Sequence, residues 1–252
     1  MLDARNISVN FGGVRAVDDV SLAAQANEIL GIIGPNGSGK TTFLNALSGV
    51  IPARGSLFVD AKPIPLGHPS ATRAAGVMRV FQHPQIFGSL TCLENVCLSS
   101  PKRRFTSVIG AWCARPSMLS LERQRWQRAF AALDFVGIAH LANAGGDELT
   151  YGQQRLLEIA RAIAGEPRVL LLDEPSAGLN DAETKQLQQL VQSLRASGLA
   201  LVVVDHKIDF IDALCDRVAV LELGQLIAFG GTAEVWSDAK VVDAYLGVAH
   251  GA

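Results

Sequence analysis

Residues Gly34–Thr41 have the types and the spacing that bind the phosphate groups of a nucleotide. Their sequence, Gly-Pro-Asn-Gly-Ser-Gly-Lys-Thr, matches every fixed position of the pattern G-x-x-x-x-G-K-[ST]. The glycines let backbone N–H groups turn inward toward phosphate oxygens, and the helix that follows favours anions at its N-terminal end. We expect Lys40 to reach the β- and γ-phosphates, Thr41 to bind Mg²⁺ and Thr42 to bind a phosphate oxygen. The candidate nucleotide-binding residues of this loop are Gly34, Asn36, Gly37, Ser38, Gly39, Lys40, Thr41 and Thr42.

Two adjacent carboxylates, Asp173 and Glu174, follow the apolar run Val169–Leu172. A strand at that run would place them at the carboxyl edge of an α/β sheet, where ligands bind. We expect Asp173 to hold Mg²⁺ directly or through water, and Glu174 to act as the general base for an attacking water. The pair could instead simply end a strand, but a phosphate loop in the same chain favours the catalytic interpretation.

These groups require a sheet that positions them, and the hydrophobic pattern predicts one. Residues 28–33 are expected to form a buried strand and residues 40–48 the next helix. The unbroken apolar runs at 169–172 and 199–204 are typical of parallel strands covered on both faces. Residues 181–197 have helical spacing, and a glycine follows them. This alternation predicts an α/β fold.

A second region, residues 90–145, shows helical patterns and no clear strand. We interpret it as a helical subdomain inserted into an α/β core formed by residues 1–89 and 146–252. Within it, residues 102–128 carry seven basic side chains and one acidic one. This segment is either a solvated helix face and loop, or a surface near anionic lipid headgroups or the cytoplasmic loops of a partner.

Composition narrows the class of protein. Of the 252 residues, 49% are hydrophobic and 18% charged, which excludes a disordered chain. The net charge of −2 argues against nucleic acid as a partner. No apolar run approaches the roughly 20 residues that a membrane span needs, and the N-terminus shows no signal-peptide pattern. The four cysteines form no C-x-x-C pair, which fits a reducing cytoplasm.

The order of motifs along the chain resembles the ATP-binding subunit of ABC transporters. The motifs that carry the resemblance are the phosphate loop, Phe81-Gln82, the segment Leu149-Thr150-Tyr151-Gly152-Gln153, the acidic pair and His206. Together they cover nearly the whole chain. The resemblance implies a single domain, residues 1–252, with a P-loop NTPase core of mixed, largely parallel sheet and flanking helices. It also implies an N-terminal antiparallel β part, an inserted helical subdomain that ends at the signature motif, and ATP and Mg²⁺ as cofactors.

The resemblance assigns roles to single residues. Phe11 matches the aromatic residue that stacks on adenine, although a core aromatic is an equal alternative for this residue type. Gln82 resembles the glutamine that contacts Mg²⁺ and the attacking water. His206 matches the histidine that bonds the γ-phosphate.

The segment at 149–153 resembles the LSGGQ signature, with Thr150 in place of serine and Tyr151 in place of the first glycine. Thr150 keeps a hydroxyl for the γ-phosphate, and Gly152 and Gln153 match the motif. Beyond the signature, an asparagine stands at position 180, where the family usually has aspartate. Lys207 stands where many relatives have aspartate or methionine.

In this family the signature acts on the nucleotide of a second subunit. The resemblance therefore implies a second ATPase subunit, identical or different, with two ATP molecules sandwiched head to tail. It further implies two transmembrane permease subunits, an external solute-binding protein and a peripheral location on the cytoplasmic face of the cell membrane.

A narrower resemblance is to importers of branched-chain amino acids and the related urea and amide importers. It rests on Thr150–Arg161, on Ala177–Asn180, on a long helical segment at 100–130 and on the C-terminal Ala244–Gly247. The expected function is to drive uptake of such a small polar solute. Two alternatives remain: an export-type ATPase like those of lipopolysaccharide extraction, and a soluble ABC protein outside transport. One phosphate loop and no heptad run argue against the soluble class.

Overall fold

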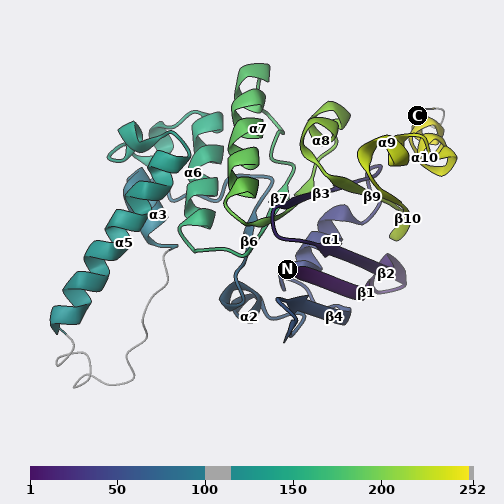
Figure 1. Cartoon of the computed structure of the whole chain (residues 1–252), viewed down its shortest axis with the longest axis horizontal. Helices are drawn as coiled ribbons and strands as arrows, with labels where there is room; N and C mark the ends of the chain where they lie inside the picture. The colour runs from purple at the N-terminus through teal and green to yellow at the C-terminus, as the bar shows by residue number, and fades with distance from the viewer. Residues whose placement is uncertain (100–114, 250–252) are drawn as a thin grey trace. The chain divides into compact units, whose positions relative to one another are not determined.

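The computed structural model of the chain describes residues 1–99 and 115–249 (Figure 1). Contacts divide the chain into two units: a sheet unit, Met1–Gln82 with Arg168–Ala252, and a helical unit, His83–Pro167. Much of the basic segment predicted at 102–128 lies outside the described residues.

A six-stranded sheet forms the centre of the sheet unit, with the order β10-β9-β3-β8-β7-β6. Its neighbours pair in parallel, except that β10 pairs antiparallel with β9. The predicted strands are confirmed, and every residue of β3, β7 and β8 is buried. The strands are β3 (Glu28–Ile33), β6 (Val77–Val80), β7 (Val169–Asp173), β8 (Ala200–Val204), β9 (Arg217–Glu222) and β10 (Gln225–Gly230).

Both faces of this sheet are covered, as its continuous apolar strands require. On one face the alternate residues of β3, β7, β8 and β9 share a core with helix α1 and with the antiparallel sheet. On the other face a Cβ on Gly31 would contact Ile211 of α8. The helices of this unit are α1 (Lys40–Leu47), α2 (Pro69–Ala74), α7 (Asp181–Ala196), α8 (Ile208–Leu214), α9 (Thr232–Trp236) and α10 (Ala239–Ala249).

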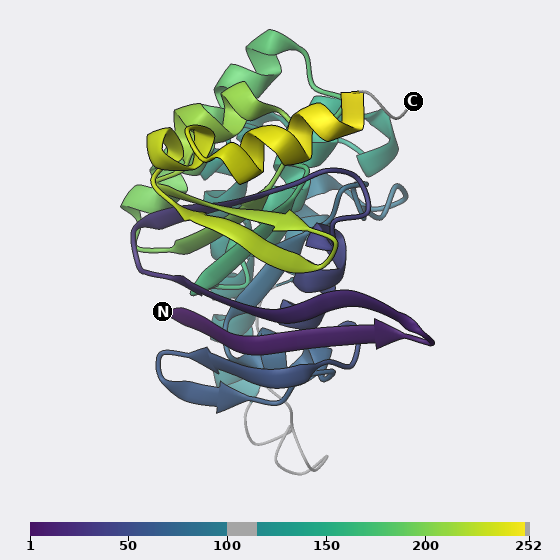
Figure 2. The ribbon, with the colours of Figure 1, turned by 90° about the vertical axis from the view of Figure 1, so that its right-hand side faces the viewer.

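The second sheet is antiparallel, with the order β2-β1-β4-β5, and it confirms the expected N-terminal β part. Figure 2 shows its purple hairpin, β1–β2, extending beside the blue strand β4. The strands are β1 (Leu2–Phe11), β2 (Val14–Ala24), β4 (Arg54–Val59) and β5 (Lys62–Ile64).

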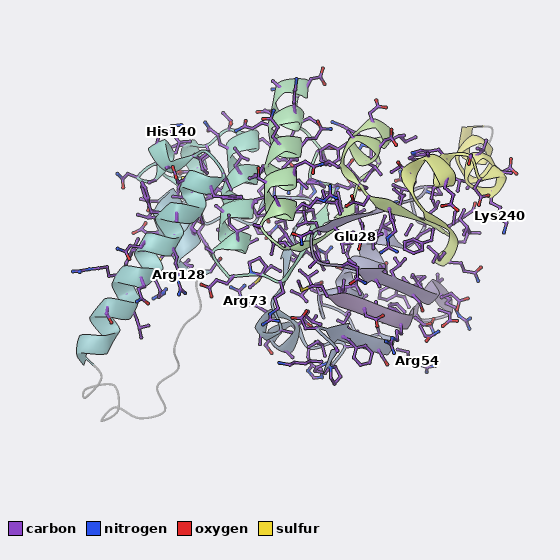
Figure 3. All side chains as sticks on the ribbon, viewed as in Figure 1. Glu28, Arg54, Arg73, Arg128, His140 and Lys240 are labelled. Atoms are coloured by element: carbon purple, nitrogen blue, oxygen red, sulfur yellow. The ribbon has the colours of Figure 1, made fainter. Side chains whose placement is uncertain are left out.

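An ion pair joins β3 to β9 at the start of β3, away from the end that leads into the phosphate loop. Figure 3 labels its carboxylate, Glu28, and Arg217 is the cation. Burial raises the pKa of Glu28, but hydrogen bonds from Arg217 and the Gln25 N–H hold that pKa below its ordinary value overall. The pair therefore stabilises the folded sheet while Glu28 is ionised.

The helical unit contains no strand among its described residues, as predicted. It consists of α3 (Cys92–Cys97), α5 (Arg115–Phe135), η1 (Ala139–Leu141), η2 (Gly146–Glu148) and α6 (Tyr151–Ile163). The unit spans residues 83–167, whereas the sequence interpretation gave 90–145. Helix α6 packs against α3 and α5 within it.

The apolar residues at helical spacing along α5 and just after it are only partly buried. Ala129, Leu133 and Val136 are buried, whereas Trp126 and Phe130 are 37% and 49% exposed. Their spacing puts all five residues on one face, but the contacts of α5 with α3 and α6 cover only part of the width of that face. Within the described part of the chain, no helix combines the length and the apolar character that a membrane span requires.

Candidate active site

The predicted phosphate loop connects β3 to α1 and is held against two strands. Gly34 and Gly39 have φ of +147° and +99°, which L-residues with a side chain rarely adopt. A Cβ on Gly34 would overlap the carbonyl oxygen of Leu221 on β9, and one on Gly39 would overlap that of Ala16 on β2. Glycine is therefore required at both positions for backbone conformation and for close packing.

The N-terminal end of α1 faces the loop without a side-chain cap. Gly39 occupies the cap position, and the next residue, Lys40, begins the helix. The N–H groups of the first turn have no partners inside the helix, so this end favours an anion. Thr41 is exposed and Thr42 half-buried at this turn, whereas Ser38 is buried and Asn36 and Gly37 are exposed in the loop.

Lys40 folds back into the loop that precedes it. Its Nζ donates to the carbonyl oxygens of Gly34 and Pro35, at 2.7 and 3.0 Å, and to Ser38 Oγ at 3.4 Å. Burial lowers the pKa of Lys40 from its ordinary value, while the negative charges of Glu174 and Asp173 act in the opposite direction. The loop thus holds a preplaced cation beside two carboxylates.

The carboxyl end of β7 carries the acidic pair, as predicted. Asp173 is buried and forms an ion pair with Arg79 of β6, with 2.6 Å between Oδ2 and Nη2. The same guanidinium donates to Asn45 Oδ1 at 2.5 Å and to Ser48 Oγ at 3.3 Å, both at the C-terminal part of the α1 region. Arg79 thereby connects the candidate magnesium ligand to the helix that begins at the phosphate loop.

Glu174, Gln82 and His206 meet at this edge of the sheet. Gln82 follows β6, and its Nε2 donates to Glu174 Oε2 at 2.7 Å. His206 follows β8, and its Nδ1 lies 3.8 Å from the same oxygen. The His206 side chain is 56% exposed, so its ring is open to solvent at the site. The three residues predicted as catalytic therefore converge, although they come from three different strands.

The backbone of Glu174 is in the left-handed region, with φ of +44°. Non-glycine residues in this region are strained and cluster at functional sites. Its N–H donates to Val204 O at 2.7 Å, which ties the end of β7 to the end of β8. The turn directs the Glu174 carboxylate toward Gln82 and His206.

Phe11 lies at the far tip of the β1–β2 hairpin and is 51% exposed, so it is no core aromatic. Its hairpin reaches the phosphate loop through β2. Asp18 N–H donates to Gly224 O at 2.8 Å, and Gly224 N–H donates to Ser38 O at 3.1 Å. The hairpin is thus anchored on the loop, with its aromatic tip in solvent.

The signature residues belong to the helical unit and form the start of α6. Thr150 is the N-cap: its Oγ1 accepts from Gln153 N–H at 3.3 Å, and Gln153 Oε1 accepts from Thr150 N–H at 2.9 Å. The helix begins at Tyr151. Tyr151, which replaces a glycine of the motif, has its hydroxyl 3.3 Å from the buried Arg155.

Two residues of the sheet edge were missed by sequence reasoning. Arg79 is the one charged residue in a strand whose other residues are apolar. Because a buried arginine needs a partner, this pattern could have predicted an ion pair. Asp205 lies directly before His206, fully buried, and accepts three backbone N–H groups, a role that adjacency alone does not reveal.

The oxygen donors at this edge suit a hard cation. No cluster of three or more His, Cys, Asp and Glu that could hold a metal occurs among the described residues. Mg²⁺ is typically held by one or two carboxylates and by substrate phosphates rather than by a complete protein cage. The carboxylate of Asp173, the hydroxyl of Thr41 and the amide oxygen of Gln82 are donors of the type that it prefers.

Comparisons with known proteins agree with this arrangement. Residues 17–177 match the sequence profile of the ABC transporter family. The chain is 34% identical to LivG, a high-affinity branched-chain amino acid transport ATP-binding protein of Salmonella typhimurium, over 99% of this chain and 98% of LivG.

The chain is also similar to solved structures of ABC transporter cassettes. A nucleotide-free ATP-binding cassette of an ABC transporter superposes with a TM-score of 0.84 at 31% identity, over 97% of this chain and 98% of that one. A dimeric bacterial ABC transporter cassette gives a TM-score of 0.74 at 27% identity, over 92% and 99%. Because the profile spans more than half of the chain and the relatives match it nearly end to end, the chain belongs to the ABC transporter family, as an ATP-binding subunit with ATPase activity.

Proposed function

We propose that the chain hydrolyses ATP to drive a membrane importer of branched-chain amino acids or a closely related small solute. The observation that carries the catalytic part is the convergence of Gln82, Glu174 and His206 beside a loop that holds Lys40. The observation that supports the solute is the end-to-end similarity to a branched-chain amino acid transport protein.

Nucleotide binding is proposed to begin at the phosphate loop. Its first-turn N–H groups and Lys40 present positive charge, and glycines at positions 34, 37 and 39 let the backbone approach the phosphates closely. Phe11 would stack on the adenine ring, and its exposure at the tip of its hairpin supports this role. Asp173, Thr41 and Gln82 would hold Mg²⁺, which when bound neutralises charge on the phosphates.

Glu174 is proposed as the general base. Its carboxylate would accept a proton from the attacking water at Oε2, the oxygen that also accepts the hydrogen bond from Gln82 Nε2. Gln82 fixes the direction of that carboxylate. His206, through its exposed ring, would donate a hydrogen bond to the γ-phosphate, and Lys40 would hold the charge that develops there.

The active assembly is proposed to be a dimer of ATPase subunits. Support comes from the dimeric form of a related cassette and from the position of Thr150, Gly152 and Gln153 at a helix N-terminus, which favours phosphate. These residues would act on the nucleotide bound by the partner subunit. Two permease subunits and an external binding protein would complete the importer at the cytoplasmic face of the membrane.

Uptake measurements test the transport proposal. Cells that lack this chain should lose uptake of radiolabelled leucine, isoleucine or valine and regain it with the wild-type chain but not with Glu174→Gln. Co-purification of Glu174→Gln from native membranes with ATP should recover two permease subunits and a second ATPase subunit. Unchanged uptake of all three amino acids in the deletion strain would overturn the solute assignment, and purification without any membrane protein would overturn the transport role.

A further inference from the structure

The side chain of Lys207, the residue after His206, makes a specific contact with another turn of the sheet edge. Its Nζ donates to the carbonyl oxygen of Ser176 at 3.2 Å. Ser176 lies two residues after Glu174 and is completely buried. The contact therefore reaches from the turn that carries His206 to the turn that carries the proposed general base.

Asp205 holds the same two turns together from inside. Its Oδ1 accepts the N–H groups of His206 and Lys207, at 2.8 and 3.0 Å. Its Oδ2 accepts the N–H of Ser176 at 3.1 Å. Ser176 is thus held at its N–H by a carboxylate and at its carbonyl by an ammonium group, one on each side of the same residue. The Leu179 N–H, at 3.3 Å, adds a local turn contact to that carbonyl.

The residue that needs such support is Glu174. Its left-handed backbone is strained and persists only when the surroundings over-determine it. The turn after it is closed by Ala177 N–H donating to Glu174 O at 3.1 Å, and Ser176 lies within that turn. Fixing Ser176 at both its backbone groups therefore fixes the direction in which the Glu174 carboxylate leaves the strand.

We infer that Lys207 is a positioning residue for hydrolysis: with Asp205 it clamps Ser176 and so holds Glu174 in register with His206. This inference rests on the proposed role of Glu174. The clamp contacts neither the phosphate loop nor Lys40, so it sets the rate of the chemical step and leaves nucleotide affinity unchanged.

The test separates kcat from KM. Lys207→Met keeps an unbranched apolar stem and removes the charged donor at its end. Loss of one charge-assisted hydrogen bond predicts a fall in kcat of about fivefold to tenfold. KM for ATP, and the equilibrium Kd of a ribose-labelled fluorescent ATP analogue, should change by less than about twofold. Lys207→Arg, which retains a donor of similar reach, should recover most of the lost kcat.

Lys185→Met is the matched control, because Lys185 is an exposed lysine of α7 in the same unit; its kcat should equal the wild-type value. Asp205→Asn, which places an amide against backbone N–H groups, should lower kcat further at unchanged KM. An unchanged kcat in Lys207→Met, or equal losses in Lys207→Met and Lys207→Arg, would overturn the positioning role. Glu174→Gln is measured alongside: if it turns over normally, the proposed base itself is wrong, whereas an inactive Glu174→Gln beside a fully active Lys207→Met refutes the clamp alone.

Discussion

Replacing Arg79 by methionine should destabilise the sheet unit severely, because it leaves a buried carboxylate without its cation. The side chains of Arg79 and Asp173 are only 5% and 4% exposed, so water replaces little of the lost contact. Removing one member of a buried pair typically costs about 3–5 kcal/mol. Arg79 also loses its hydrogen bonds to Asn45 and Ser48, which places the expected cost toward the upper part of that range.

Thermal unfolding of the purified chain, followed by circular dichroism, measures this cost. A loss of about 4–5 kcal/mol corresponds to a fall in Tm of roughly 8–20 °C for a chain of this size. Arg217→Met is the control, because it removes the cation from the ion pair between Arg217 and Glu28. The side chain of Arg217 is 35% exposed and that of Glu28 is 11% exposed. This more exposed pair should cost about 1 kcal/mol. Arg79→Met combined with Asp173→Asn should recover part of the loss, since the uncompensated charge is removed.

The reasoning would be refuted if Arg79→Met and Arg217→Met lowered Tm equally. It would also fail if the double variant were as unstable as the sum of its single variants. Either result would mean that the loss reflects packing of the arginine side chain rather than the buried charge of Asp173.

Four further outcomes follow from the site and the fold. Lys40→Ala should lose binding of a fluorescent ATP analogue by more than about tenfold, because the phosphates lose their preplaced cation; near-normal ATPase activity would contradict the site. Glu174→Gln should bind ATP normally and turn over at least about a hundredfold slower, as a coupled phosphate-release assay would measure. Gly39→Ala should weaken ATP binding and cost about 1–3 kcal/mol of stability, whereas a wild-type Tm would mean that the loop tolerates a side chain. The pKa of Glu28 is lower in the folded chain than in the unfolded chain. Ionised Glu28 therefore adds to the free energy of unfolding above its unfolded-state pKa, and this stabilisation is lost as the pH falls through its folded-state pKa. Glu28→Gln should therefore lose less stability than wild type between about pH 7 and about pH 3.

Local patterns predicted the parts of the fold that depend on neighbouring residues. The apolar runs at 169–172 and 199–204 are unbroken because both faces of the strands that they form are covered. The phosphate loop was predicted at every position because its glycines and lysine are tied to one backbone shape. The convergence of Gln82, Glu174 and His206 required the motif order of a family, since no local pattern brings three strand ends together.

Contacts between distant segments could not be predicted in the same way. The pairing of Arg79 with Asp173 spans 94 positions, and only the strand order, with β6 beside β7, makes it possible. The exposure of Trp126 and Phe130 depends on how much of α5 its neighbours cover. The hydrophobic periodicity of a sequence identifies the apolar face of a helix, but it does not show how much of that face a neighbouring element will bury.

The capping box of α6 also determines which chemical groups its first turn can offer. Thr150 Oγ1 and Gln153 Oε1 each accept a hydrogen bond from a backbone N–H group. The capping box leaves the hydroxyl hydrogen of Thr150 and the amide NH₂ of Gln153 unused, and both of these groups are donors. A threonine and a glutamine, each able to accept as well as donate, are thereby biased toward electron-rich ligands. A helix cap that serves folding thus also selects the polarity of what can bind there.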